Sequence, residues 1–570
     1  MSFSVNSISY RYSAEHETVL KEVSFIIKPG QVTAIVGPSG CGKSTLVSIL
    51  SGVIPDLVSN GEMTGSIEVR QDALISVVSQ SPENQLFGYG VEDAIAFGIE
   101  NLGLDNESIV ERVEYVLDLL NIQHLRQRSV ATLSGGQRQA VCIASVLAMQ
   151  PDILILDEPV SSLDPNGKKM IQTVLNSLKD AGQTVIIFDN NLEWSAGIVE
   201  HIIGLCAGEV VFDGDKPAFF YDADLLRKLA VTVPQEVEIY HALAKSVPGL
   251  NRFFSLSEAK QEIGKLISPS LETTGCAPAT SAESASEPDV SVVQTTGLCK
   301  TFRDGFNALI DIDATFKQGR VISILGQNGS GKTTLVKHLN GLYRPSKGSV
   351  TYRGQSTAGK SVAQISKDII LVFQNPELML FEETVLRELT FCARAQKIDF
   401  NEAEALEVLR RYGLLSHREE FPVNLPMGQK HLLTILSVLF SSAEVVILDE
   451  PTLGMDQQQK QLLQEIIRQL KANGKTVVVI SHEIPLVFQI SDEIMVLNNG
   501  RKLMQDVRQI LAGCDELFEQ INIALPPVVV LARYFGLTPE CCDVAAFVAG
   551  VTARLGEANE TQAERGTAHG

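Results

Sequence analysis

An internal duplication constrains the fold of this 570-residue chain more than any other feature of its sequence. Three segments recur in the same order: GPSGCGKST (residues 37–45) as GQNGSGKTT (326–334), ILILDEP (153–159) as VVILDEP (445–451), and TVIIFDNNLE (184–193) as TVVVISHEIP (476–485). The members of each pair are about 290 residues apart, so both the order and the spacing are kept. The chain therefore contains two copies of one domain in tandem.

Each copy alternates strand-like segments with helical ones. Short apolar runs such as QVTAIVG and DILILD in the first half, and VISILG and EVVILD in the second, are each followed by a segment with helical periodicity. This alternation is typical of α/β domains built on a largely parallel sheet. We therefore expect two α/β domains.

The glycine-rich repeat lies between a strand and a helix, as in TAIVGPSGCGKSTLVSIL (residues 33–50). In such a turn the backbone N–H groups and the helix N-terminus converge on nucleotide phosphates. The lysine reaches the β- and γ-phosphates, and the following hydroxyl ligates Mg²⁺. The residues expected at the phosphates are Gly37, Ser39, Gly40, Gly42, Lys43, Ser44 and Thr45 in the first half, and Gly326, Asn328, Gly329, Gly331, Lys332, Thr333 and Thr334 in the second.

An Asp-Glu pair follows a strand in each half. We expect Asp157 and Asp449 to contact the metal's water shell. Glu158 and Glu450 are placed to orient or deprotonate the attacking water. A single glycine-rich motif arises by chance, but two motifs in register with two Asp-Glu pairs make that explanation a poor one.

The segment LSGGQ (residues 133–137) is similar to the signature motif of a known family. With it the sequence resembles the ATP-binding-cassette (ABC) ATPases over nearly the whole chain, and the second half has LPMGQ (425–429) at the same distance before its Asp-Glu pair. The resemblance implies two tandem ABC-type P-loop ATPase domains. Each would have a RecA-like core, a helical signature subdomain and a small C-terminal appendage.

The resemblance also implies roles for individual residues, with ATP and Mg²⁺ as cofactors. Gln80 and Gln374 match the family's Q-loop, SSLD (161–164) and LGMD (453–456) match its D-loop, and His482 matches its switch histidine. The implied catalytic residues are Glu450, His482, Glu158, Gln374 and Gln80; the implied metal contacts are Ser44, Thr333, Gln80, Gln374, Asp157 and Asp449; and the implied signature contacts to nucleotide are Ser134, Gly135, Gly136 and Gln137. Tyr12 and Phe302 lie where the family stacks an aromatic ring on adenine, although an aromatic in an early strand is often core.

Domain boundaries follow from the repeat and the resemblance. We expect a first ABC domain at 1–232 with an appendage at 233–268, a linker at 269–291, a second ABC domain at 292–525, and an appendage and tail at 526–570. The linker is rich in Ser, Ala, Thr and Pro and reads as a flexible tether, whereas an ordered loop of that length would be unusual. We also expect the two halves to form an intramolecular pseudo-dimer.

Within the ABC superfamily, QSPENQLFGYGVEDAIAFGIENLGL (residues 80–104) is similar to the ATPase subunits of energy-coupling factor (ECF) importers. Such importers pair two ATPases with an integral membrane coupling protein and a small membrane substrate-binding protein. The resemblance implies uptake of a vitamin, a precursor or a metal ion, at the cytoplasmic face of the membrane. It also implies that Glu83 and Glu377 receive basic residues of the coupling protein, the alternative being solvated loop carboxylates.

The two halves differ in two motifs that matter in this family, the signature and the switch position. Pro426 and Met427 replace the Ser-Gly of the signature, and Asn190 stands where the second half has His482. In the family each ATP lies between the Walker motifs of one domain and the signature of the other, so both departures fall on the site built on the first half. We expect one consensus and one degenerate ATP site; the alternative is that both hydrolyse ATP.

Composition excludes several other classes of protein. A formal net charge of −21 argues against nucleic-acid binding, because sequence-independent binding of phosphates needs clustered Lys and Arg. The nine scattered cysteines suggest neither a zinc site nor a disulfide framework. No apolar run approaches the roughly 18 residues of a membrane span, so membrane contact is expected only through partners. The remaining alternatives are the ATPase of a conventional ABC importer and, with less support, a soluble tandem ABC ATPase acting on ribosomes.

Overall fold

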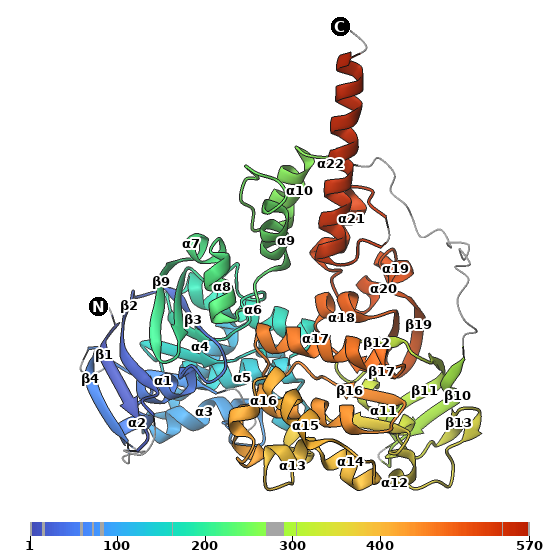
Figure 1. Cartoon of the computed structure of the whole chain (residues 1–570). Helices are drawn as coiled ribbons and strands as arrows, with labels where there is room; N and C mark the ends of the chain where they lie inside the picture. Colours follow the sequence, from blue (N-terminus) through green and yellow to red (C-terminus); the bar gives the residue numbers. More distant parts are fainter. Residues whose placement is uncertain are drawn as a thin grey trace. The chain divides into compact units, whose positions relative to one another are not determined.

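The structure is a computed structural model (Figure 1) that describes residues 3–13, 17–56, 61–70, 73–79, 85–161, 163–269, 290–303, 305–538 and 540–567. The chain separates into two compact units, unit 1 (Met1–Pro234) and unit 2 (Gln235–Gly570). Both contain a six-stranded, mostly parallel sheet and a smaller antiparallel sheet. The expected α/β fold with two tandem domains is confirmed.

In unit 1 the larger sheet positions the predicted site. Its strand order is β5 (Ile75–Val78), β6 (Ile153–Asp157), β7 (Thr184–Phe188), β3 (Val32–Val36), β8 (His201–Cys206) and β9 (Glu209–Asp215), with only the β8–β9 pair antiparallel. All residues of β3 and β7 are buried, as expected for parallel strands covered on both faces. The smaller sheet contains β2 (Leu20–Ile27), β1 (Phe3–Arg11) and β4 (Glu62–Glu68).

The helices of unit 1 follow the strands and include those of the signature region. They are α1 (Lys43–Leu50), α2 (Val53–Asp56), α3 (Val91–Asn101), α4 (Asn106–Leu119), α5 (Gly135–Leu147), α6 (Pro165–Asp180), α7 (Lys216–Phe220) and α8 (Ala223–Leu229), with short 3₁₀ turns η2 (Gln123–Leu125) and η3 (Val130–Thr132). Helix α5 packs against both α3 and α6, and its inward residues are almost all buried.

Unit 2 repeats this arrangement. Its larger sheet has the order β15 (Ile369–Val372), β16 (Val445–Asp449), β17 (Thr476–Ile480), β12 (Val321–Leu325), β18 (Glu493–Asn498) and β19 (Arg501–Val507), and its smaller sheet contains β11 (Asn307–Lys317), β10 (Ser291–Thr301), β13 (Lys347–Tyr352) and β14 (Gln355–Ser356). Only the β18–β19 pair of the larger sheet is antiparallel. The matching strand orders are the structural counterpart of the sequence duplication.

The helices of unit 2 fall into three groups. Those of the core and signature region are α11 (Lys332–Leu339), α12 (Val362–Ile365), α13 (Val385–Leu389), α14 (Phe391–Gln396), α15 (Glu402–Arg411), α16 (Met427–Ser437), α17 (Gln457–Ala472) and α18 (Ile484–Ile490), with η4 (Pro376–Leu378), η5 (Leu415–His417), η6 (Pro422–Asn424) and η7 (Val438–Phe440). The C-terminal group is α19 (Arg508–Leu511), α20 (Asp515–Gln520), α21 (Pro527–Tyr534) and α22 (Val544–Thr567). The third group, α9 (Gln235–Ala244) and α10 (Leu256–Gly264), comes from the end of the first half of the sequence.

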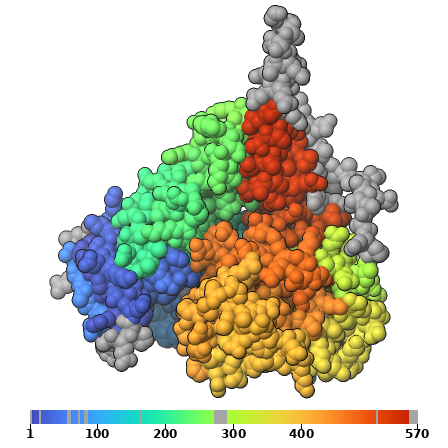
Figure 2. Space-filling view, in the orientation of Figure 1, coloured from blue at the N-terminus to red at the C-terminus, as the bar shows by residue number. Residues whose placement is uncertain are grey.

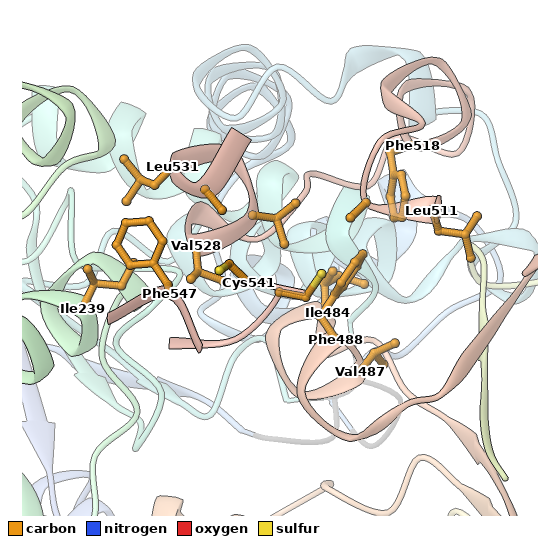
Figure 3. Close-up of a cluster of buried hydrophobic side chains, with 14 of the residues drawn as sticks. Ile239, Ile484, Val487, Phe488, Leu511, Phe518, Val528, Leu531, Cys541 and Phe547 are labelled. Atoms are coloured by element: carbon orange, nitrogen blue, oxygen red, sulfur yellow. The ribbon is translucent and has the colours of Figure 1, made fainter. Parts of the chain in front are cut away.

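Helices α9 and α10 share one apolar core with the C-terminal helices. Ile239, Phe253 and Ile263 are buried in the same cluster as Phe535 and Phe547, and Figure 3 shows Ile239 beside Phe547. In the space-filling view the green surface of α9 and α10 meets the red surface of the C-terminal helices (Figure 2). The segment that follows the first half is therefore packed as part of unit 2. Among the described residues, no helix has the length and apolar composition needed to cross a bilayer.

Candidate active site

The two glycine-rich loops have the same conformation around their lysines. In unit 1, Lys43 Nζ donates to the carbonyl oxygens of Gly37 (2.6 Å) and Pro38 (3.2 Å). In unit 2, Lys332 Nζ donates to those of Gly326 (2.8 Å) and Gln327 (2.9 Å). Each ammonium group therefore lies folded over a loop at the N-terminus of a helix, where nucleotide phosphates would replace the carbonyl oxygens as its partners.

Close backbone packing explains why the first position of each loop is glycine. A Cβ atom on Gly37 would lie 2.0 Å from the carbonyl oxygen of Leu205, and one on Gly326 would lie 2.2 Å from that of Leu497. The loop could not sit at the end of the central strand with a larger residue there. The other predicted phosphate-site residues lie in the same two loops or in the first turns of α1 and α11: Ser39, Gly40, Gly42, Ser44, Thr45, Asn328, Gly329, Gly331, Thr333 and Thr334.

Asp157 and Asp449 end strands β6 and β16, beside the glycine-rich loops. Thr333 Oγ1 donates to Asp449 Oδ1 at 3.3 Å, which brings together a hydroxyl and a carboxylate, the oxygen ligands that Mg²⁺ prefers. Burial raises the pKa of Asp157 to about 6 and also raises the pKa of Asp449. A bound cation would favour the ionised form of both carboxyl groups, so the residues present fit Mg²⁺.

Glu158 and Glu450 both adopt a left-handed backbone conformation, with φ of 45° and 50°. Residues other than glycine rarely adopt it, and such strain is concentrated at functional sites. Their N–H groups continue the sheet, donating to the carbonyl oxygens of Phe188 (2.8 Å) and Ile480 (2.9 Å). Burial raises the pKa of both carboxyl groups, that of Glu158 to about 7 with a contribution from the neighbouring Asp189. Both are therefore suited to accept a proton.

The switch position differs between the units. In unit 2, His482 Nε2 lies 3.0 Å from Glu450 Oε1, and the backbone N–H of His482 donates to Glu450 Oε2 at 3.2 Å. In unit 1, the side chain of Asn190 instead accepts a hydrogen bond from the backbone N–H of Gly37 at 3.0 Å. The side chain at the switch position thus contacts the glutamate in unit 2 and the glycine-rich loop in unit 1.

Asp189 is a buried charged residue that sequence reasoning missed. Its carboxylate accepts hydrogen bonds from Trp194 Nε1 (2.9 Å) and from the backbone N–H of Asn191 (2.8 Å). Unit 2 has Ser481 at the corresponding position, where the hydroxyl accepts a hydrogen bond from the N–H of Glu483. The sequence difference that could have pointed to Asp189 is FDNN in the first half against ISHE at the aligned place in the second.

The two signature segments begin their helices differently. Ser134 caps α5: its hydroxyl accepts from the N–H of Gln137 (3.3 Å), and its own N–H donates to Gln137 Oε1 (3.1 Å). Pro426 caps α16 and has neither group. Consequently Gln429 Oε1 is buried without a hydrogen-bond partner in the part of the chain that the structure describes. Met427 is 37% exposed and lies against Gly454 of its own unit.

Comparison with known proteins identifies the family. The sequence profile of the ABC transporter family matches residues 20–161 and 309–453. The chain belongs to this family. The ABC chain is 32% identical over 554 residues to a Methanosarcina mazei protein named "Putative ABC transporter ATP-binding protein" (94% of each chain), and 32% identical over 543 residues to the Bacillus subtilis "Putative HMP/thiamine import ATP-binding protein YkoD" (92% and 94%). It is accordingly an ABC-type ATPase that binds ATP.

Solved structures agree on the fold of the ABC chain. An archaeal ribosome recycling factor, aABCE1, crystallised with ribosomal stalk protein aP1, matches with a TM-score of 0.58 at 21% identity, covering 90% of this chain and 92% of that one. A structure titled "RNase-L Inhibitor" gives 0.57 at 21% identity over 90% of this chain and 93% of that one. Likeness at this identity shows the shared tandem fold and nothing about partners.

The predicted adenine contacts of the ABC ATPase have different surroundings in its two units. Tyr12 is half-exposed, and its hydroxyl lies 2.9 Å from Thr45 Oγ1 in helix α1. Phe302 lies in an edge-on arrangement with Tyr343, and Lys300 Nζ lies over both rings. Tyr12 therefore lies beside the glycine-rich region, whereas Phe302 lies against a tyrosine that follows helix α11. Adenine stacking on both residues stays a prediction.

The Q-loop region of the ABC ATPase is described only in unit 2. Gln80 and Glu83 lie outside the described residues. Gln374 is exposed and lies two residues after the end of β15. Glu377 forms an ion pair with Lys430 of α16, with 2.6 Å between Oε1 and Nζ. Its carboxylate, with 49% of the side chain exposed, therefore already has a cationic partner within the chain, and a docking role for it stays a prediction.

Proposed function

We propose that this ABC ATPase is the ATP-binding and hydrolysing subunit of a membrane importer of the ECF type, for a vitamin, a precursor or a metal ion. It would lie at the cytoplasmic face of the membrane, held by an integral coupling protein that works with a small membrane substrate-binding protein. The observation that carries the proposal is a pair of exposed apolar side chains that follows the Q-loop glutamine in the sequence of each unit. Phe87 (53% exposed) and Tyr89 (92%) form it in unit 1, and Leu378 (72%) and Phe381 (62%) form it in unit 2.

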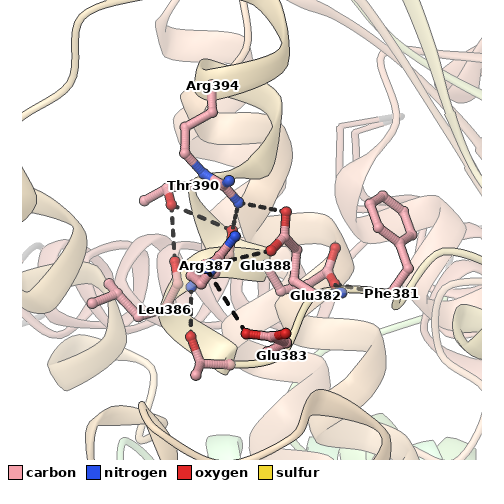
Figure 4. Close-up of polar contacts among 9 residues, drawn as sticks. Phe381, Glu382, Glu383, Leu386, Arg387, Glu388, Thr390 and Arg394 are labelled. Atoms are coloured by element: carbon pink, nitrogen blue, oxygen red, sulfur yellow. Dashed lines mark hydrogen bonds and ion pairs between the residues drawn. The ribbon is translucent and has the colours of Figure 1, made fainter.

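In unit 2 the segment that carries this pair is held by hydrogen bonds and ion pairs. Glu388 Oε2 accepts the backbone N–H groups of Phe381 and Glu382, both at 2.9 Å, and Glu382 in turn pairs with Arg387 (2.9 Å) and Arg394 (2.7 Å) (Figure 4). A loop tied down in this way keeps an aromatic side chain in water at a cost that a partner surface would remove. The ECF-like sequence at residues 80–104 and the relative named for HMP/thiamine import support an importer.

In unit 2 the residues support one arrangement for hydrolysis. Lys332 and the loop N–H groups would bind the β- and γ-phosphates, and Thr333, Asp449 and Gln374 would hold Mg²⁺, which supplies positive charge for the phosphate oxygens. Glu450 would orient the water whose oxygen bonds to the γ-phosphorus as the bond to the ADP oxygen breaks, and it would take the water's proton. His482 would keep the Glu450 carboxylate in place and donate to the γ-phosphate.

The site on unit 1 would bind ATP but hydrolyse it more slowly than the site on unit 2. Its loop, Ser44 and Asp157 are those of a complete phosphate and metal site, but Asn190 is turned to Gly37 and leaves Glu158 without a switch histidine. By resemblance, the signature that completes this site is the one altered at Pro426 and Met427. We therefore propose that unit 2 carries the consensus Walker residues and unit 1 the degenerate site.

Co-purification tests the proposal. The tagged full-length chain is recovered from membranes of its own organism, and integral membrane proteins should accompany it in stoichiometric amount. Phe381→Asp with Leu378→Asp should abolish this recovery while retaining ATP binding. A matched control is Phe306→Asp, another exposed aromatic (56%) in the turn between β10 and β11, which should behave as wild type. Sedimentation of the chain with ribosomes, and no membrane protein with it, would overturn the importer assignment.

A further inference from the structure

A buried ion pair lies beside the switch histidine of unit 2. Lys460 Nζ is 2.9 Å from Glu483 Oε1, and only 8% and 24% of the two side chains are exposed. An ammonium group so far from water is unfavourable unless a negative group lies against it. The pair is therefore a fixed contact, unlike the exposed ion pairs on the surface of the unit.

The pair joins two segments that serve the predicted site. Lys460 lies in the first turns of α17, directly after the D-loop, and Asp456 caps that helix by accepting the N–H of Gln459 at 2.9 Å. Glu483 immediately follows His482 and precedes α18. The ion pair thus fixes the backbone after the switch histidine to the helix after the D-loop.

The backbone at this point matters for Glu450. His482 contacts the Glu450 carboxylate through its ring nitrogen (3.0 Å) and through its own backbone N–H (3.2 Å). A displacement of the 482–483 backbone would move both groups at once. Misplacement of catalytic groups by about 1 Å is enough to lower a rate by about a hundredfold.

Unit 1 offers an internal comparison. Lys168 lies at the same place after its D-loop aspartate as Lys460 does, but Asn191 stands in the place of Glu483. The segment is instead held by Asp189 and Trp194. The charged pair is therefore present in the unit that has a switch histidine in contact with its glutamate.

We propose that Lys460 is a positioning residue for ATP hydrolysis in unit 2: by holding Glu483 it keeps His482 against Glu450. This inference rests on the proposed roles of Glu450 and His482. Lys460 itself contacts neither nucleotide nor water in the reaction, so its loss should lower kcat and leave KM for ATP nearly unchanged.

Steady-state ATPase assays of the full-length chain in its transporter complex test this. Lys460→Met should lower kcat about tenfold to a hundredfold with KM within threefold of wild type. Lys460→Arg keeps the charge and should retain most of kcat. Lys168→Met is the matched control and should leave kcat within twofold, because Asn191 stands where unit 2 has Glu483.

A double variant separates positioning from stability. Lys460→Met with Glu483→Gln removes both charges, so it should recover the thermal stability that either single change loses. Because the anchor is still missing, kcat should stay low. Recovery of wild-type kcat in the double variant, a loss of less than twofold in Lys460→Met, or an equal loss in Lys168→Met would each overturn the inference.

Glu450→Gln is measured alongside these variants. If Glu450→Gln keeps wild-type turnover, the proposed hydrolytic site of unit 2 is wrong, and the positioning role of Lys460 is rejected as well. If it loses turnover while Lys460→Met does not, only the positioning role of Lys460 is rejected.

Discussion

The side chain of Gln235 accepts a hydrogen bond from the backbone N–H of Val528, with 2.9 Å between Oε1 and N. Gln235 starts α9, in the segment after the first half, and Val528 lies in the first turn of α21, in the corresponding segment after the second half. Both residues are buried. The bond satisfies an N–H group that a helix cannot satisfy in its own first turn, so one appendage caps a helix of the other.

The apolar core around this bond should contribute strongly to stability. Phe535 is fully buried in the cluster shared by α9, α10 and the C-terminal helices. Phe535→Ala should lower the free energy of unfolding of unit 2 by about 3–5 kcal/mol, because it removes a large buried side chain and leaves a cavity. Denaturant unfolding of the full chain measures this. Val423→Ala, at an exposed site, is the control and should shift stability by less than about 0.5 kcal/mol.

The two glutamates should differ in their importance for turnover. Glu450→Gln should lower ATPase activity by a factor on the order of 10² to 10³, which is the usual effect of removing one group that acts on the reacting atoms. Glu158→Gln should cost much less, because Asn190 is directed at Gly37 and the unit lacks the histidine contact. The measurement is steady-state activity of both variants in the assembled transporter. Equal losses would show that the two sites are equally competent or fire in strict dependence, and the proposed asymmetry would be wrong.

Restoring a serine at position 426 should stabilise the start of α16. The backbone of Pro426 (φ −54°, ψ 150°) is close to that of Ser134 (φ −67°, ψ 165°), so serine fits without strain. Its N–H would supply a partner for Gln429 Oε1, and its hydroxyl would be a second acceptor for Gln429 N, which already donates to the carbonyl oxygen of residue 426 at 2.9 Å. We expect a gain of about 1 kcal/mol, measured by thermal unfolding. Pro426→Ala restores the N–H alone and should gain less; an equal gain from both would show that the hydroxyl does not cap the helix.

His431 should make unit 2 sensitive to acid. It is fully buried in α16, and neither ring nitrogen has a hydrogen-bond partner among the described residues. Burial lowers the pKa of His431 from 6.5 to about 4. Between these values the unfolded chain binds a proton that the folded chain excludes, so stability falls as the pH decreases from 6.5 to 4.

The test compares wild type with His431→Gln, which places there the residue that unit 1 has at Gln139. The variant should lose less stability between pH 7 and pH 4.5, by roughly 1–3 kcal/mol, in urea unfolding at several pH values. Parallel loss in the two proteins would mean that His431 is protonated or hydrated in the folded state.

Local sequence was enough to predict the glycine-rich loops and the strands that end in Asp-Glu. The residues of such a motif largely determine its backbone conformation. Gly37 and Gly326 are required because a Cβ atom there would lie about 2 Å from a carbonyl oxygen, and the helix that follows starts at the lysine. The alternation of strand-like and helical segments then predicted the α/β fold class, and the duplication predicted that this domain occurs twice. The loss of capping groups at Pro426 could likewise be read from the residue alone.

Partners that depend on packing could not be predicted in this way. Glu377 pairs with Lys430, Asn190 accepts from Gly37, and Lys460 pairs with Glu483, and in each case the two residues are far apart in the sequence. The identity of a polar or charged residue does not say how deeply the fold buries it. Burial decides whether such a side chain needs a fixed partner. The assignment of α9 and α10 to unit 2 has the same origin. An appendage at 233–268 could be predicted from the sequence, but only tertiary structure decided that the appendage of the second half covers it, because apolar burial is non-directional and any complementary surface can satisfy it.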